Sequence, residues 1–355
     1  MSKKILILLD GGLGNVFFQL FAAFRLSFET GREVLFKHIK NQRWINTVLP
    51  KMRRYDVEIS DVDINELIKS CPEINEDTIY SNAHKQDIGS SEYVVLKGLF
   101  QDYRLFAQYE PAFETIVGLC DLRENTLRKL RHPIIQKRFA QNQLYGRAFL
   151  LDCSEIVTVS IHIRRGDYES LRCYHLLLTD YYYKNAVLNI LTRYGKKTRV
   201  KFLCFYENES AIEAQKIIDR VQVALAPFGY GEEYWHFNDM VKIEDEPSVK
   251  IEDEPSVKIE DEPVVKIEDE RETPQIEYYD EMIAMSLCDN HIIANSTFSW
   301  WGAYLNKSQT KIVCYPDEFF NHNLFYVSIK GLEVDGWTKI SCWDPAELKC
   351  ECGWR

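Results

Sequence analysis

The sequence has no hydrophobic run long enough to cross a membrane. None of its 355 residues lies in an apolar stretch that approaches the roughly 20 residues a membrane-spanning helix requires. The apolar run at residues 5–9 reaches Asp10 after only five residues, which is too short for the core of a secretory signal. We therefore expect a cytoplasmic protein without a membrane span, whose first apolar run is a buried strand.

Metal-binding and disulfide patterns are also missing from the sequence. The ten cysteines show no recurring spacing and no Cys-x-x-Cys pair, and the eight histidines do not cluster with them. A zinc site is therefore not expected. Because we expect no export signal, reduced thiols are a better interpretation of these cysteines than a disulfide framework.

Two common nucleotide-binding patterns are present only in part. Residues 11–15 (GGLGN) lie between an expected strand at residues 4–10 and an expected helix at residues 15–30, as in a loop that approaches a phosphate. Phe17 replaces the third glycine of a dinucleotide fingerprint, which disfavours an NAD-linked oxidoreductase. The Lys-Ser/Thr ending of a P-loop is missing, which disfavours a P-loop kinase. A tight turn without a ligand is the alternative for this loop.

Charge of one sign is concentrated in one segment. Residues 241–272 are four copies of an octapeptide, VKIEDEPS in its full form, with 13 acidic and 5 basic residues. Removing them from the totals of 54 and 43 leaves 41 acidic and 38 basic residues, which does not indicate a nucleic-acid-binding protein. The densest basic stretch, residues 123–138, allows peripheral contact with a membrane surface, although a solvated helix face is the commoner explanation.

The octapeptide repeats are too short to form a solenoid, whose units run to roughly 20 residues or more. Proline recurs in three of the four copies and breaks any helix, and one small apolar pair per copy cannot offset the entropy of ordering. We expect a mobile, disordered acidic loop between a strand and a helix, with a docking segment for a basic partner as the alternative. Deletion of residues 241–272 should leave folding and activity nearly intact.

The rest of the chain alternates between strand and helix patterns, which predicts an α/β fold. The length favours two domains, and we place them at residues 1–150 and 151–355, the second interrupted by the repeats. Each is expected to carry a parallel sheet covered by helices, with the two domains facing each other across a cleft. Further strands are expected at residues 33–36, 93–96, 156–163, 200–205, 234–237, 291–294 and 311–314, and helices at residues 114–145, 179–194, 210–225, 275–288 and 296–305.

Two adjacent arginines follow the apolar strand expected at residues 156–163. Residues 162–168 read HIRRGDY, so Arg164 and Arg165 come directly after that strand. Open α/β sheets bind ligands at the carboxyl ends of their strands, and planar guanidinium groups match phosphate oxygens. The pattern therefore indicates an anion site. An internal ion pair with Asp167 or with a surface acid is the alternative.

A second candidate anion site follows the strand expected at residues 291–294. Asn295, Ser296 or Thr297 can cap the next helix and offer hydroxyl and amide groups at its positive end. Both candidate sites would then lie at the same edge of one parallel sheet. The alternative is a well-capped helix whose Trp300 and Trp301 pack in the core, and for the tryptophans we prefer this interpretation.

Three segments together resemble one enzyme family. They are residues 11–15 with Phe18 and Gln19, residues 162–168, and residues 292–301 (IIANSTFSWW). The chain is similar in these segments to the α-1,2-fucosyltransferases, glycosyltransferase family 11, and residues 98–102 (GLFQD) resemble that family's first domain. The resemblance implies a GT-B-type fold of two Rossmann-like domains, with GDP held by the second domain and the acceptor facing the first.

The resemblance also implies the reaction and its participants. The enzyme would transfer L-fucose from GDP-β-L-fucose to the 2-hydroxyl of a terminal β-galactoside, with inversion and without a metal or other cofactor. Charge that develops on the departing GDP would be met by fixed cations and dipoles. The alternatives that remain are a glycosyltransferase that uses another GDP-sugar, and an inactive protein that binds a glycan or a nucleotide.

Roles for individual residues follow from the same resemblance. Arg164 and Arg165 would bind the diphosphate, and Asp167 would act as the base or hold the arginines in place. The residues expected on the donor side are Gly14, Asn15, His162, Asp280, Glu281, Asn295, Ser296 and Thr297. Gln101 and Asp102 are expected on the acceptor side, with Asp102 a remoter candidate for the base. The chain departs from the family's usual carboxylate at Asn208 and from its usual Asp at Glu281.

Overall fold

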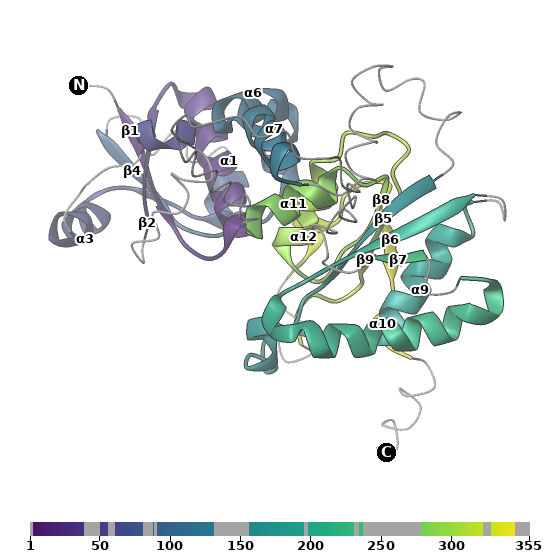
Figure 1. The fold of residues 1–355 in the computed structure, drawn as a ribbon. Coiled ribbons are helices and arrows are strands. Elements are labelled where there is room, and N and C mark those ends of the chain that lie inside the picture. The colour runs from purple at the N-terminus through teal and green to yellow at the C-terminus, as the bar shows by residue number, and fades with distance from the viewer. Residues whose placement is uncertain are drawn as a thin grey trace, which may run out of the picture.

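The computed structural model of the chain contains two parallel sheets with helices around them (Figure 1). It describes residues 3–38, 50–55, 61–80, 88, 91–130, 156–194, 198–230, 234–236, 278–321 and 328–344. The expected domain boundary near residue 150 and the repeats at residues 241–272 lie outside these described residues. Each half of the chain supplies one sheet, and the order of the strands in each sheet determines which loops lie side by side.

The first sheet has four strands in the order β2-β1-β4-β3, paired in parallel. Its strands are β1 (Lys4–Leu9), β2 (Glu33–His38), β3 (Glu73–Ile74) and β4 (Tyr93–Leu96). The helices of this half are α1 (Leu13–Thr30), α3 (Asp61–Ser70), α4 (Glu76–Tyr80), α6 (Glu110–Val117) and α7 (Leu119–Lys129). The long helix α1 ends where Gly31 adopts φ 68° and its N–H returns to the carbonyl of Ser27 at 2.8 Å.

The second sheet has six strands in the order β10-β9-β8-β5-β6-β7, again paired in parallel. Its strands are β5 (Ile156–Ile163), β6 (Arg199–Tyr206), β7 (Trp235–His236), β8 (Asn290–Ile292), β9 (Val313–Pro316) and β10 (Thr338–Ile340). Its helices are α9 (Asp180–Leu191), α10 (Ala211–Leu225), α11 (Tyr278–Ser286) and α12 (Thr297–Tyr304). The central strand β5 is rich in Ile and Val, as expected for a strand buried on both faces.

An aromatic core joins the two halves of the chain. Helices α11 and α12 lie between the two sheets (Figure 1), and α12 packs against α1. Trp301 of α12 meets Phe17 at 5.4 Å and Phe21 at 5.1 Å between ring centroids, and Trp300 meets Phe18 at 4.8 Å. These rings are all fully buried. The position of α12 relative to α1 is therefore fixed by apolar packing as well as by polar contacts.

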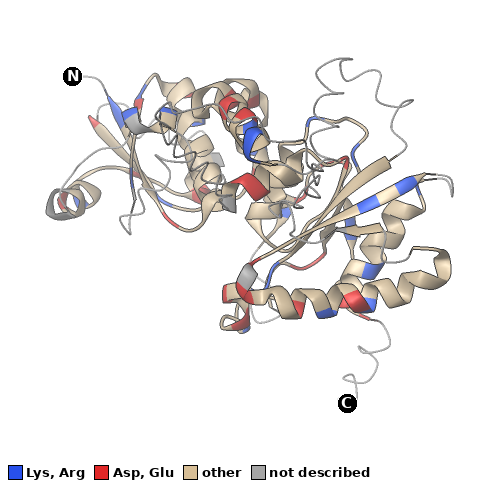
Figure 2. Cartoon of the chain, in the orientation of Figure 1, with Lys and Arg blue, Asp and Glu red and all other residues tan. Residues whose placement is uncertain are grey.

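Charges of both signs are interspersed along the exposed helix α10 (Figure 2). Lys216 pairs with Glu213 at 2.7 Å, and Arg220 pairs with Asp180 of α9 at 3.3 Å. All four side chains are well exposed, so solvent screens both ion pairs.

The α/β fold class with two parallel-sheet domains, expected from the sequence as a GT-B-type arrangement, is confirmed. Strands β4 and β5 have the bounds expected from their apolar runs, and most other expected strands and helices that fall on described residues are found within a few residues. The helix expected at residues 114–145 is instead two helices, α6 and α7, which are separated at Gly118 with φ 76°, and residues 131–145 lie outside the described residues. Helices α3 and α4 and strands β3 and β10 were not expected. The two strands are two and three residues long, so they carry too little periodicity to be recognised in the sequence.

Candidate functional site

The polar residues that follow β5, β6 and β8 meet at one edge of the second sheet. These three strands are neighbours in the order β8-β5-β6, and all are parallel. Their carboxyl ends therefore bring Arg164 and Arg165, Glu207, and the residues around Ser296 to the same edge. The juxtaposition of the arginines with the start of α12, expected from the sequence, is found.

Arg164 is held between two carboxylates. Its Nη1 contacts Glu207, which follows β6, and its Nη2 lies 2.6 Å from Oδ1 of Asp167. The guanidinium carbon also lies 5.2 Å from the centroid of the Tyr168 ring. The sequence left open an anion site or an internal ion pair for this arginine, and the structure contains the ion pair.

Arg165 has a carboxylate partner of its own. Its Nη1 lies 3.2 Å from Glu169, and its Nη2 donates to the carbonyl of Leu178 at 3.3 Å. The Arg165 backbone N–H donates to Oε2 of Glu207 at 3.3 Å. The Nε atoms of both Arg164 and Arg165 are buried and have no hydrogen-bond partner among the described residues. Each arginine therefore has one buried N–H that no described residue satisfies.

The turn after the arginines is tied to neighbouring strands and helices. Gly166 has φ 28°, and its N–H donates to Oγ of Ser210 at 2.8 Å. The Tyr168 hydroxyl donates to the carbonyl of Asn295 at 3.0 Å, and its ring stacks on His175 with centroids 3.9 Å apart. Burial raises the pKa of Tyr168 to about 12, so this hydroxyl stays a donor. Tyr168 thus links the arginine turn to the residues before α12.

His162 lies inside the sheet. Its side chain is buried beside Phe298, and burial, together with the charge of Arg164, lowers its pKa to about 3. Its backbone carbonyl accepts from the hydroxyl of Tyr183 at 3.0 Å, and its Nδ1 has no hydrogen-bond partner among the described residues. The imidazole is therefore neutral at physiological pH.

Helix α12 begins with a conventional polar cap. Oγ of Ser296 accepts from the N–H of Phe298 at 3.3 Å. The Asn295 amide donates to the carbonyls of Leu176 and Phe319, each at 2.8 Å, and its buried Oδ1 has no partner among the described residues. Asn295 therefore holds two loops beside the helix, and Ser296 is the N-cap residue of α12.

Three expected site residues from both halves of the chain meet at a single oxygen. Oδ1 of Asn15 accepts from Oγ1 of Thr297 at 2.9 Å and from Nε2 of Gln101, also at 2.9 Å. Asn15 lies in the first turn of α1, and Gln101 follows β4. The contact between the first half and the start of α12 is thus polar at its rim, with the aromatic core behind it.

Gly14 permits the close approach between α1 and α12. A Cβ at this position would lie 2.6 Å from both the carbonyl carbon and Oγ1 of Thr297. The Gly14 carbonyl accepts from Nε1 of Trp301 at 2.8 Å. The glycine-rich loop was expected to approach a phosphate. In this structure its close approach at Gly14 is to helix α12.

Three expected acidic residues have other surroundings. The Asp102 carboxylate caps the turn of residues 103–105 and accepts from Nε of Arg104 at 2.8 and 3.1 Å. Asp280, in the first turn of α11, is fully buried and contacts Lys129 at 2.8 Å and Thr126 at 2.5 Å, both on α7. Glu281 is its half-buried neighbour on the same turn. Asp102 is thus paired with Arg104, and Asp280 is held by α7.

The site also contains three residues that were not expected from the sequence, Glu207, Glu169 and Ser210. Glu207 follows β6 directly, at the same sheet edge as Arg164, so its position after a strand was the available signal. Glu169 lies four residues after Arg165, a spacing that brings side chains together only if the chain turns there. Ser210 gives no comparable signal in the sequence.

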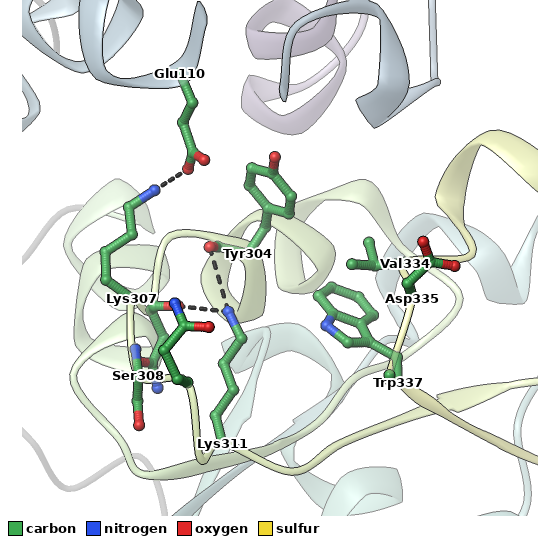
Figure 3. A pocket seen from close by; sticks show the side chains of 11 residues that line it. Glu110, Tyr304, Lys307, Ser308, Lys311, Val334, Asp335 and Trp337 are labelled. Carbon is green, nitrogen blue, oxygen red and sulfur yellow. Dashed lines mark hydrogen bonds and ion pairs between the residues drawn. The ribbon is translucent and has the colours of Figure 1, made fainter. Parts of the chain in front are cut away.

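A separate cavity of about 260 Å³ lies at the other end of α12 (Figure 3). Glu110 and Lys307 form an ion pair across it, and Lys311 donates to the carbonyls of Ala303 and Asn306. Lys307 and Lys311 thus already have partners within the chain at this cavity, which the length of α12 separates from Ser296. Within the residues that the structure describes, no group of three or more His, Cys, Asp or Glu side chains could hold a metal, and no helix is long and apolar enough to cross a membrane.

Comparisons with known proteins agree with the motifs. The family model described as Glycosyl transferase family 11 matches residues 265–326. Two curated proteins of Escherichia coli are similar over part of the chain. The O-antigen biosynthesis glycosyltransferase WbnK is 28% identical over 191 residues, which are 53% of this chain and 46% of that protein. An alpha-1,2-colitosyltransferase is 30% identical over 167 residues, 46% of this chain and 41% of that protein. The chain thus spans less than half the length of these relatives.

The solved structures that the chain matches have low sequence identity and TM-scores below 0.5. A mutant of FUT1 from Arabidopsis thaliana, in complex with GDP, is 10% identical with a TM-score of 0.45, covering 86% of this chain and 69% of that one. The NodZ alpha-1,6-fucosyltransferase co-crystallized with GDP is also 10% identical, with a TM-score of 0.41, covering 86% of this chain and 93% of that one.

Proposed function

We propose that the chain is a member of glycosyl transferase family 11 and that it transfers L-fucose from GDP-β-L-fucose to the 2-hydroxyl of a terminal β-galactoside. The transfer inverts the configuration at the sugar and requires neither a metal nor another cofactor. The second half of the chain binds GDP, and the first half faces the acceptor.

One observation carries this proposal, namely the position of Arg164 and Arg165 beside the capped start of α12. The Tyr168 hydroxyl links the arginine turn to Asn295, one residue before the cap. A helix N-terminus and guanidinium groups both attract phosphate oxygens. Together they meet the negative charge that develops on GDP when the fucose–phosphate bond breaks.

The carboxylates now bound to the arginines have a consequence for donor binding. Glu207 and Asp167 contact Arg164, and Glu169 contacts Arg165. A diphosphate that binds the same guanidinium groups must share or displace these partners. The proposal therefore predicts that donor affinity depends on the charge of the carboxylates as well as on the arginines.

The likeness to an alpha-1,2-colitosyltransferase supports a second candidate for the donor. Contacts to a diphosphate do not distinguish one GDP-linked sugar from another. Transfer of colitose in place of fucose would use the same arginines and the same helix end. Side-by-side assays with GDP-fucose and GDP-colitose at equal concentrations distinguish the two candidates.

The first experiment measures GDP release from GDP-fucose in EDTA, with and without lactose. Arg165→Ala should lower kcat by about 10²–10³-fold, as does loss of one donor in a comparable charge-stabilising site, while the fold is retained. Arg220→Ala is the matched control, because Arg220 is an exposed arginine paired on the surface of α10. A folded Arg165→Ala enzyme with most of its activity would refute the role of Arg165. Failure of the wild type to bind GDP-fucose would refute the assignment of GDP-fucose as the donor.

A further inference from the structure

The carboxylate that removes the acceptor proton is not identified by the motifs, and the structure offers a candidate outside them. Asp10 follows β1 directly, at the carboxyl end of an inner strand of the first sheet. Its side chain is half-buried, and Oδ1 accepts from the N–H of Gly11 at 2.9 Å. No salt bridge to Asp10 is found in the described part of the chain. The carboxylate is thus oriented at one oxygen and has a second oxygen to offer.

Asp10 lies in the part of the first half that meets α12. Its backbone N–H donates to Oε1 of Gln19 at 3.1 Å, and Nε2 of the same Gln19 donates to the carbonyl of Gly98 at 3.0 Å. Gln19 thereby joins the end of β1 to the end of β4. The loop that begins at Gly11 continues to Asn15, which contacts Thr297. Asp10 therefore lies in the first half of the chain, at the start of the loop whose Asn15 contacts the start of α12.

Inversion sets the side from which a base must act. The acceptor oxygen attacks the sugar from the face opposite the departing phosphate, so the base lies across the ring from the groups that hold the phosphate. Arg164, Arg165 and Ser296 all belong to the second half of the chain. A base from the first half therefore has the required placement.

The other two candidate bases fit this requirement less well. Asp167 contacts Arg164 at 2.6 Å, so it lies on the same side as the departing GDP. Asp102 is 3% exposed, and both its carboxylate oxygens contact Arg104. Each of these carboxylates already has a guanidinium partner within its own half of the chain.

We propose that Asp10 is the catalytic base, an inference that rests on the proposed function. The carboxylate accepts the proton of the acceptor hydroxyl. At the same time a bond forms between the acceptor oxygen and C1 of fucose, and the bond from C1 to the β-phosphate oxygen breaks. The electron pair of that bond leaves with GDP, so the products are the fucosylated acceptor, GDP and a protonated Asp10.

Asp10→Asn tests this role with little change in structure. Asparagine keeps an oxygen that accepts from the Gly11 N–H, but it cannot take a proton. We expect kcat with lactose to fall by about 10²–10⁴-fold, the usual contribution of a general base. The affinity for GDP, measured by calorimetry, should not change. Asp77→Asn, at an exposed carboxylate on α4 of the same half, is the matched control and should keep wild-type activity.

A second acceptor separates loss of the base from damage to the site. Azide attacks without a proton to remove, so transfer of fucose to azide should proceed at the wild-type rate in Asp10→Asn. Retention of most lactose activity would overturn the proposal. Loss of GDP binding, or equal loss of transfer to lactose and azide, would overturn it as well, because it would assign Asp10 a structural role. A wild type that transfers fucose to neither acceptor would instead refute the proposed function, and the inference with it.

Discussion

Gly14 and Thr297 lie so close together that a single methyl group does not fit between them. A Cβ at Gly14 would lie 2.6 Å from Oγ1 of Thr297, a separation that real Cβ atoms essentially never show. The contact joins the first turn of α1 to the first turn of α12, at the residues where the two halves of the chain meet. The absence of a side chain at residue 14 therefore sets how closely the helix that caps the site approaches the first half.

Gly14→Ala should destabilise the protein and disturb the site. The added methyl group must displace backbone atoms of α12, which in a well-packed region costs about 1–3 kcal/mol of unfolding free energy. Chemical unfolding measures this loss. Gly12→Ala is the matched control, because nothing lies within 4 Å of a Cβ there. Equal stability of the two variants would show that α12 can move away without cost.

Glu169→Gln should increase the affinity for GDP. Glu169 contacts both Arg165 and Arg172, so its charge competes with a diphosphate for Arg165. A partly exposed ion pair of this kind is worth about 0.2–1 kcal/mol, which corresponds to a decrease in Kd of roughly fivefold or less. Calorimetric titration with GDP measures the change, and Glu213→Gln on α10 serves as the control. Weaker binding by Glu169→Gln would indicate that this carboxylate orients Arg165 rather than competes for it.

Unfolding free energy should fall with decreasing pH because of His162. Its pKa is about 3 in the folded chain and about 6.5 when unfolded, so between these values the unfolded chain binds the extra proton. The stabilising effect of the neutral ring is complete above pH 6.5 and is lost as the pH falls towards 3. From pH 7 to pH 5 this amounts to about 2 kcal/mol.

Urea unfolding at pH 7 and pH 5, with wild type and His162→Leu, measures this dependence. The variant should lose about 2 kcal/mol less than the wild type between the two pH values. Burial also lowers the pKa of His291 well below its usual value. The unfolding free energy of the variant should therefore still fall with decreasing pH, but by less than that of the wild type. Identical pH dependence in both proteins would show that His162 does not titrate differently on folding.

Asp280→Asn should affect stability more than donor binding. The carboxylate is fully buried and paired with Lys129, and removal of one partner from a buried ion pair costs about 3–5 kcal/mol. The carboxylate contacts Thr126 and Lys129 of α7, so the Kd for GDP should stay within about twofold of the wild type at a temperature where the variant is folded. A much weaker Kd in a folded variant would restore the donor-side role that the resemblance implies.

The sequence predicted the fold well where its patterns are long. The apolar runs at β4 and β5 end in polar or glycine residues, so the bounds of these strands were predictable. The prediction that Arg164 and Ser296 share a sheet edge also held, because parallel strands place their carboxyl ends together. Short elements such as β3 and β10 could not be found, because two or three residues show no periodicity.

By itself, the sequence determined which functional groups follow which strands. Two arginines follow β5, a capped helix follows β8, and a glycine-rich turn follows β1. Tertiary structure alone decided which groups face each other. The bond from Thr297 to Asn15 spans 282 positions in the chain, and the contact of Arg164 with Glu207 depends on the pairing of β5 with β6. The reason is physical, since strand and helix patterns depend on neighbours in sequence, whereas ion pairs and close approaches depend on packing between segments that the sequence keeps apart.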